Sequence, residues 1–262
     1  MTPKQPESNV QLVQSLSRGL AVIRAFDQDH PRQTLAQVAE VTGLARATTR
    51  RFLHTLVAEG YAATDGSEFW LTPHVLTLGY SYLSSLGLPA IAQPHLESAS
   101  HLLGESCSAA VLDGEDVVYV ARSAANRIMR ENITIGTRFP AYAAALGRVL
   151  LAGLPPEELE HSLSTTHFTP LTPKTITDPA KLREVLAEVA EQGWCIVDQE
   201  LEAGLRSVAC PVLDERGEVV AAVNVSTQVA AYTYEEIVEK LLPSLQATAR
   251  AISRDVRTAA LN

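Results

Sequence analysis

The sequence has little cysteine and no long hydrophobic segment, and each absence narrows the class of protein. The three cysteines, Cys107, Cys195 and Cys210, form no CxxC pair and have no histidine at metal-ligand spacing. Neither a zinc site nor a disulfide framework is therefore indicated, and we expect reduced thiols. No apolar run approaches the roughly 20 residues that a membrane-spanning helix needs, and the polar N-terminus lacks a signal-peptide core. The sequence predicts a soluble, cytoplasmic protein without a membrane partner, a metal or another cofactor.

The motifs of several enzyme classes are missing as well. The sequence has no GxSxG nucleophile elbow, no HExxH motif and no phosphate-binding glycine loop. Cys107, Cys210 and His101 are chemically able to take part in catalysis, but a nucleophile needs a base in a defined context, and no such context is visible. An enzyme that uses a pocket in the C-terminal half is therefore the minor alternative to a protein that works by binding.

Length and charge indicate two different parts. A chain of 262 residues favours two domains over one large core. Residues 1–86 contain seven basic and seven acidic residues, whereas residues 87–262 contain 14 basic and 23 acidic residues and so carry the whole net charge of −9. An acidic body repels DNA except where a locally basic head approaches it. The composition permits DNA binding without requiring it.

The N-terminal part has the pattern of a helix-turn-helix. Apolar spacing predicts a first helix over residues 15–26. Thr34 and Gln37 have the spacing of a capping box, which predicts a second helix that begins at Thr34 and ends at Thr42-Gly43. A third helix is expected over residues 45–59. Asp65-Gly66 lies between two short extended segments and predicts a hairpin, which completes the winged-helix order.

The third helix carries the candidate DNA-binding residues. Its apolar residues form one stripe, and the arginines and threonines of its first two turns are expected to point outward. Arginine can pair with guanine, and threonine can contact a phosphate or a thymine methyl group. The alternative is an ordinary solvated helix face. The candidate DNA-binding residues are Thr34, Arg46, Ala47, Thr48, Thr49, Arg50 and Arg51.

The rest of the chain predicts a linker helix and a mixed α/β (α+β) domain with an antiparallel sheet. The helix over residues 73–88 has broad apolar coverage, which indicates a dimer. Helices are expected over residues 90–103, 141–154, 155–164, 178–192 and 234–257, and strands over residues 106–112, 117–123, 130–135, 195–200, 206–213 and 218–227. The expected domains are a polar arm (1–14), a winged helix-turn-helix (15–72), the linker helix (73–88) and an effector-binding domain (89–262).

Several segments carry a family resemblance. The sequences GLARATTRRFLHTLVAEGY, VLDGEDVVYVAR, GTRFPAYAAALGRVLLAGLP, DQELEAGLRSVACPV and VVAAVNVS are similar to those of the IclR family of bacterial regulators. The resemblance implies a winged helix-turn-helix joined to a GAF-like effector domain, assembled as a homodimer or tetramer on double-stranded operator DNA. The segments LGYSYLSSLGLPAIAQPHLE and IVDQELEAGLRS further resemble the branch that regulates protocatechuate, 4-hydroxybenzoate and β-ketoadipate catabolism. Alternatives are a regulator of another pathway that senses a different organic acid, and a constitutive DNA-binding protein.

The same resemblance implies an effector pocket. Carried onto this chain, it is formed by Ile128, Glu131, Ala145, Leu146, Asp198, Leu205, Ser207, Asn224 and Ser226. Strand alternation agrees, because Asn224 and Ser226 are two residues apart and face the same side. Arg130 and Arg138 are candidates for gripping the effector's carboxylate, with surface ion pairing as the equal alternative. Glu131 and Asn224 depart from the founding family pattern, which argues against glyoxylate or pyruvate specificity.

Overall fold

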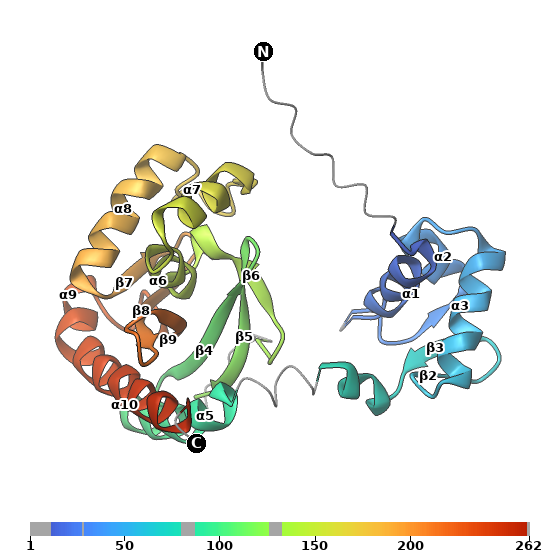
Figure 1. The fold of residues 1–262 in the computed structure, drawn as a ribbon, viewed down its shortest axis with the longest axis horizontal. Coiled ribbons are helices and arrows are strands. Elements are labelled where there is room, and N and C mark those ends of the chain that lie inside the picture. Colours follow the sequence, from blue (N-terminus) through green and yellow to red (C-terminus); the bar gives the residue numbers. More distant parts are fainter. Residues whose placement is uncertain (1–11, 28, 80–86, 126–132, 261–262) are drawn as a thin grey trace, which may run out of the picture. The chain divides into compact units, whose positions relative to one another are not determined.

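The computed structural model describes residues 12–27, 29–79, 87–125 and 133–260. The chain divides into two units, residues 1–84 and 85–262, and each is described by itself (Figure 1). The predicted linker helix begins as the short 3₁₀ helix η1 (Pro73–Val75) and continues as a helical turn through residue 79, and its remainder over residues 80–86 lies outside the described residues.

The N-terminal unit is a helix-turn-helix with a small sheet. Its elements are α1 (Gln14–Arg24), β1 (Gln33–Thr34), α2 (Leu35–Thr42), α3 (Arg46–Ala58), β2 (Ala62–Thr64) and β3 (Glu68–Leu71). The strands pair in the order β1-β3-β2. The predicted capping box is confirmed, since the Thr34 side chain accepts from the Gln37 backbone and the Gln37 side chain accepts from the Thr34 backbone. Gly43, at φ 65°, closes α2 in the left-handed conformation.

The C-terminal unit contains a six-stranded antiparallel sheet in the order β6-β5-β4-β9-β8-β7. The strands are β4 (Ser106–Asp113), β5 (Asp116–Ser123), β6 (Arg138–Pro140), β7 (Cys195–Asp198), β8 (Leu205–Leu213) and β9 (Val219–Gln228). The strand predicted over residues 130–135 is wrong in its described part, because residues 133–135 form a loop and a turn. The Thr137 hydroxyl accepts from the Thr134 backbone N–H there, and such local bonds compete with strand pairing.

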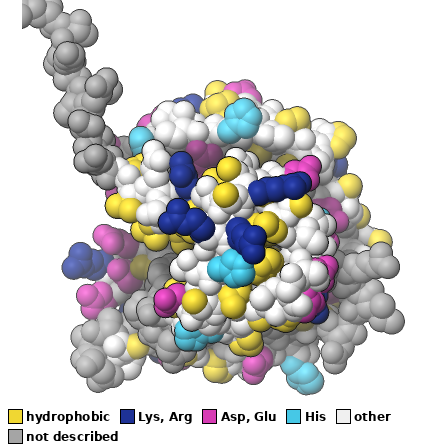
Figure 2. Space-filling model, turned by 90° about the vertical axis from the view of Figure 1, so that its right-hand side faces the viewer, with side chains coloured by type: hydrophobic (Ala, Val, Ile, Leu, Met, Phe, Trp, Pro, Cys, Tyr) yellow, Lys and Arg dark blue, Asp and Glu magenta, His cyan; other side chains and the backbone are white. Residues whose placement is uncertain are grey.

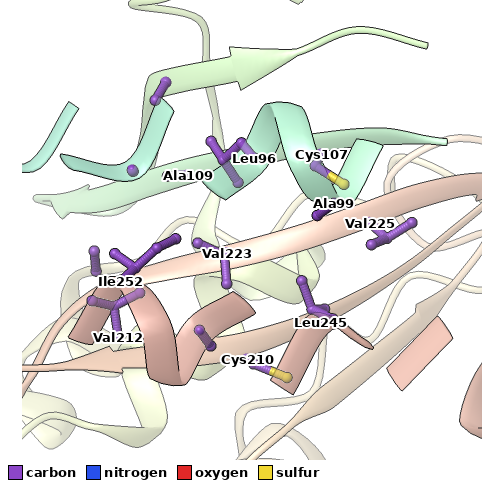
Figure 3. Packing of buried hydrophobic residues seen from close by; sticks show 14 of the residues in the cluster. Leu96, Ala99, Cys107, Ala109, Cys210, Val212, Val223, Val225, Leu245 and Ile252 are labelled. Carbon is purple, nitrogen blue, oxygen red and sulfur yellow. The ribbon is translucent and has the colours of Figure 1, made fainter. Parts of the chain in front are cut away.

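Helices cover both faces of this sheet. On one face lie α5 (Leu88–Leu103) and α10 (Leu242–Ala260), which continues from α9 (Tyr234–Glu236) and the π-helical turn η3 (Ile237–Leu241). Figure 3 shows how Leu96, Leu245 and Ile252 of these helices pack with Val212, Val223 and Val225 of the strands. On the other face lie η2 (Ala141–Ala143), α6 (Ala145–Ala152), α7 (Pro156–Thr165) and α8 (Pro179–Gln192).

Helix α6 lies unusually close to the segment before it. A Cβ atom added to Gly147 would overlap the Ala141 backbone, so only glycine permits this approach. The close packing fixes the N-terminus of α6 beside the sheet. Among the described residues, no helix is both long and apolar enough to cross a membrane.

Candidate DNA-binding surface and effector cavity

Helix α3 presents an arginine-rich surface. Arg46, Ala47, Arg50 and Arg51 are exposed, and the three arginines form no ion pair with any described residue. Figure 2 looks onto the N-terminal unit from the side of α3, and arginine side chains gather on the face that it shows. The surface is therefore open to an anionic partner.

Two of the candidate threonines have structural roles. Thr49 is fully buried and donates a hydrogen bond to the Ala45 carbonyl oxygen at 3.3 Å, so the prediction that it points outward is wrong. Thr49, Leu53 and Leu56 are spaced four and three residues apart and so share the helix face that packs inward. Thr34 uses its hydroxyl in the cap of α2, and Thr48 is half-buried.

The wing, which is the β2–β3 hairpin, is held in place by Arg32, an arginine that forms ion pairs. Arg32 pairs with Asp65 at 2.8 Å and with Glu68 at 3.3 Å, and its guanidinium lies 3.9 Å from the centre of the Trp70 ring. Asp65 also accepts backbone hydrogen bonds from Glu68 and Ser67, which lower its pKa and keep it ionised. The charge of Arg32 is thus compensated by the acids of the wing, whereas the three arginines of α3 are not compensated in this way.

The C-terminal unit encloses a cavity of about 430 Å³ between the sheet and α6. Six of the predicted pocket residues line it: Ala145, Leu146, Leu205, Ser207, Asn224 and Ser226. The sequence interpretation missed the other lining residues, which are Tyr119, Ile133, Thr137, Phe139, Ala143, Ala144, Val197, Leu201 and Glu202. Tyr119 could have been found from strand alternation, because it lies two residues from the buried Val117 of the same face.

Three predicted residues, Ile128, Arg130 and Glu131, lie outside the described residues. Asp198 is not part of the described lining; it binds Arg206 and Lys174, both at 2.7 Å. Partial burial raises the pKa of Asp198, but the hydrogen bonds from Arg206 and Lys174 outweigh it and lower the pKa to about 2. Of the two alternatives for Arg138, the structure has the surface ion pair and not the carboxylate contact, because its guanidinium binds Asp113 at 2.6 Å and Asp116 at 3.0 Å. These two acids flank the β4–β5 turn and satisfy the arginine there.

Polar side chains of the neighbouring strands β8 and β9 form one wall of the cavity. Asn224 Nδ2 donates to Ser207 Oγ at 2.9 Å and to Ser226 Oγ at 3.0 Å. The Ser207 hydroxyl in turn donates to the Val225 carbonyl oxygen at 3.2 Å. Tyr119 and Phe139 meet edge to face, with ring centres 5.7 Å apart, on the apolar side of the lining. A ligand in this cavity would meet both aromatic surface and hydrogen-bonding groups.

A buried ion pair that the sequence did not reveal supports the cavity. Arg148 of α6 binds Glu200 through two parallel hydrogen bonds of 2.7 and 2.5 Å, and the Arg148 side chain is only 2% exposed. Arg148 Nε also donates to the Tyr142 carbonyl oxygen, and Glu200 accepts from the Ile176 backbone N–H. The pair thereby ties α6 to the loop between β7 and β8, which supplies Leu201 and Glu202 to the lining.

The chain combines a winged helix-turn-helix that exposes arginines with a second domain that contains a cavity. This combination defines a DNA-binding regulator that also binds a ligand. Residues 15–66 match the model of the IclR helix-turn-helix domain, and residues 80–254 match that of the bacterial transcriptional regulator IclR C-terminal domain. The chain belongs to the IclR family of bacterial transcriptional regulators.

Individual relatives agree with this family. The chain is 45% identical over 237 residues to the Pca regulon regulatory protein of Pseudomonas putida, covering 90% of this chain and 81% of that protein. The crystal structure of a transcriptional regulator from Rhodococcus sp. RHA1 matches with a TM-score of 0.85 and 55% identity, covering 96% of this chain and 100% of that one. An IclR homolog from Microbacterium hydrocarbonoxydans, complexed with 4-hydroxybenzoate, matches with a TM-score of 0.82 and 26% identity, covering 93% and 99%.

Proposed function

We propose that the protein controls genes of aromatic-acid catabolism by binding operator DNA and a small organic acid of that catabolism. The observation that carries the proposal is the cavity of the C-terminal unit, which combines aromatic surface with the Ser207, Asn224 and Ser226 hydrogen-bonding groups. Similarity to a Pca regulon regulator and to a homolog that holds 4-hydroxybenzoate supports this ligand class. A regulator of another pathway with a different organic acid is the alternative.

The effector's carboxylate binds at the N-terminus of α6. The residue before this helix, Ala144, offers no capping side chain, and Ala145 and Leu146 line the cavity. The free backbone N–H groups and the helix dipole at such an end favour an anion. The described lining residues include one glutamate, Glu202, and no lysine, arginine or histidine, so neutral donors at α6 are the means of holding the acid.

Calorimetry with β-ketoadipate, protocatechuate and 4-hydroxybenzoate tests the effector, with glyoxylate and pyruvate as controls. We expect saturable binding of at least one acid of the aromatic set, weakened by Ser207→Ala and unchanged by Ser164→Ala, an exposed serine on α7. Binding of glyoxylate or pyruvate alone would replace the proposed ligand class, and binding of none would remove the effector function from this cavity.

Helix α3 enters the major groove of the operator. Arg46, Arg50 and Arg51 reach phosphates or guanine edges, while Ala47 and Thr48 lie beside them in the first two turns. Arg50→Ala should weaken binding to the DNA fragment upstream of the protein's own gene and lower the slope of log affinity against log salt by about 1. Arg216→Ala removes the same charge from an exposed turn of the other unit and should change neither. Equal effects of the two variants would contradict the proposed surface.

The regulator acts as a homodimer or tetramer in the cytoplasm. Helix α1 leaves Leu16 63% and Leu20 39% exposed, and these residues share one helix face. Exposed apolar stripes of this kind mark contact surfaces. Light scattering of Leu16→Glu should show a smaller assembly than that of the unchanged protein, and an unchanged mass would place the interface elsewhere.

The regulator works by binding rather than by catalysis. Burial raises the pKa of each thiol, Cys107, Cys195 and Cys210, to about 12. At neutral pH these groups are protonated, and a thiol is a poor nucleophile compared with its thiolate. The three cysteines, which are free and buried, therefore give no support to the enzyme alternative.

A further inference from the structure

A second hollow of the C-terminal unit, the α10 groove, lies beside α10. Its volume is about 520 Å³, and Pro211 and Leu213 of β8 line it together with Gly193 and one side of α10. Strand β7 pairs with β8 only as far as Cys195 and Ala209, so no described strand pairs with β8 beyond Ala209 on that side. Helix α10 covers the face of the sheet that is turned away from α6. The α10 groove is therefore separate from the effector cavity, which lies between the sheet and α6.

The edge of β8 beside the α10 groove is poorly suited to pairing with an added strand. Pro211 has no backbone N–H, and the backbone N–H of Leu213 donates to Ser253 Oγ of α10 at 2.9 Å. A strand that joins a sheet edge needs free donors there, and proline at the edge removes one of them. A ligand of the groove must therefore be held by side chains.

Three arginines of α10 provide such side chains. Arg250, Arg254 and Arg257 line the groove and are exposed. They are four and three residues apart, so they share one side of the helix and extend over about 10 Å of its length. None of them forms an ion pair with a described residue, and the described lining contains no aspartate or glutamate. Arg257 Nε donates to the Asp214 carbonyl oxygen at 2.8 Å, which leaves the positive charge of Arg257 uncompensated.

The helix dipole accounts for only one of these arginines. A cation is favoured in the last turn of a helix, where Arg257 lies, and the effect falls off within that turn. Arg250 and Arg254 lie earlier in α10, where cations one turn apart on the same side repel each other. The three arginines also contrast with residues 87–262 as a whole, which contain 14 basic and 23 acidic residues. An anion bound between the guanidinium groups would offset their repulsion.

We propose that the α10 groove is a second ligand site, which binds a small molecule with two or more phosphate or carboxylate groups. A guanidinium group presents paired N–H donors that match the oxygens of either group. Three guanidinium groups spread over about 10 Å favour a molecule with several separate charges over a single small ion. The inference goes beyond the proposed function and does not depend on the effector cavity, because α10 covers the other face of the sheet.

Calorimetry on the full-length protein tests the site with two probes and one reference. Inorganic triphosphate and citrate each carry several negative charges, whereas acetate carries one. We expect saturable binding of triphosphate or citrate, at least about tenfold tighter than that of acetate and weaker at higher salt, because salt screens exposed charges. Binding of triphosphate alone would support a phosphate ligand, and binding of citrate alone a carboxylate ligand. Absence of saturable binding by both probes would leave the arginines as an ordinary solvated helix face and overturn the proposal.

Variants then assign the binding to the groove. Arg250→Gln/Arg254→Gln removes two charges from the groove, and we expect it to weaken binding of the probe at least about tenfold. Lys181→Gln/Arg24→Gln removes the same charge from two exposed helix positions outside the groove and should leave the affinity unchanged. Ser207→Ala, in the effector cavity, should also leave it unchanged. Probe binding that persists in folded Arg250→Gln/Arg254→Gln, checked by circular dichroism, or that Ser207→Ala weakens equally, would overturn the proposal.

Binding to the DNA fragment upstream of the protein's own gene separates the α10 groove from the DNA-binding surface. We expect Arg250→Gln/Arg254→Gln to bind this fragment as tightly as the unchanged protein does. Weaker DNA binding by this variant, without binding of either probe to the unchanged protein, would assign the arginines to DNA and overturn the second ligand site. The proposed effector function would stand in that case, because it is tested by different acids in the other cavity.

Discussion

At the scale of single residues, the pair of Arg148 and Glu200 shows how charge is buried beneath the cavity. Each carboxylate oxygen of Glu200 binds one terminal nitrogen of Arg148, and further hydrogen bonds to the Tyr142 carbonyl and the Ile176 N–H satisfy the groups that remain. Breaking a buried pair leaves one charge without compensation, which costs far more than the net value of the pair.

Glu200→Gln should therefore lower the free energy of unfolding by about 3–5 kcal/mol, as measured by urea denaturation. The double variant Arg148→Met/Glu200→Leu should be less destabilised than Glu200→Gln, because no unpaired charge remains. The control is Glu160→Gln, which removes the same chemistry from the exposed pair of Glu160 with Arg183 and should change the unfolding midpoint little. Equal losses of unfolding free energy in Glu200→Gln and Glu160→Gln would show that burial does not determine how much an ion pair contributes to stability.

Gly147 sets the distance between α6 and the segment before it. Because an added Cβ would overlap the Ala141 backbone, Gly147→Ala should force α6 away from its place and destabilise the protein by about 1–3 kcal/mol. Gly19 lies in α1, where an added Cβ would meet only ordinary contacts with Phe52. Gly19→Ala should leave stability unchanged or raise it, since alanine favours helix. Thermal melts of both variants check the contrast.

At the scale of elements, ion pairs fix the end of β7. Asp198 receives hydrogen bonds from Arg206 of β8 and from Lys174, and its pKa of about 2 is below its ordinary value of 3.8. A carboxyl whose pKa is lowered by folding contributes stability that is present above about pH 4 and is lost as the pH falls toward 2. Asp198→Asn should lower the melting temperature at pH 7, and the difference should shrink between pH 4 and 2. A weaker effector affinity in this variant, at unchanged stability, would instead support the predicted ligand contact.

Local patterns predicted most of the elements. The Thr34–Gln37 capping box, the Asp65-Gly66 hairpin, and the alternation of Asn224 and Ser226 each depend on neighbouring residues, and the structure has all three. The failures come from longer range. Thr49 is inward because Leu53 and Leu56 share its face, and Arg148 meets Glu200 across 52 residues of sequence. No periodicity within one helix reports such a partner, nor the acids that bind Arg138.

At the scale of the whole molecule, a ligand-responsive regulator must couple ligand binding in the cavity of one unit to DNA binding by the other unit. If a ligand in the cavity changes operator affinity by some factor, operator DNA must change ligand affinity by the same factor, typically 5–150-fold. We expect fluorescence anisotropy of labelled operator DNA to shift when the effector is added, and calorimetry to show the reciprocal shift when DNA is present. Ligand binding without any shift in DNA affinity would favour a constitutive DNA-binding protein, because a ligand that binds both states equally cannot move the equilibrium between them.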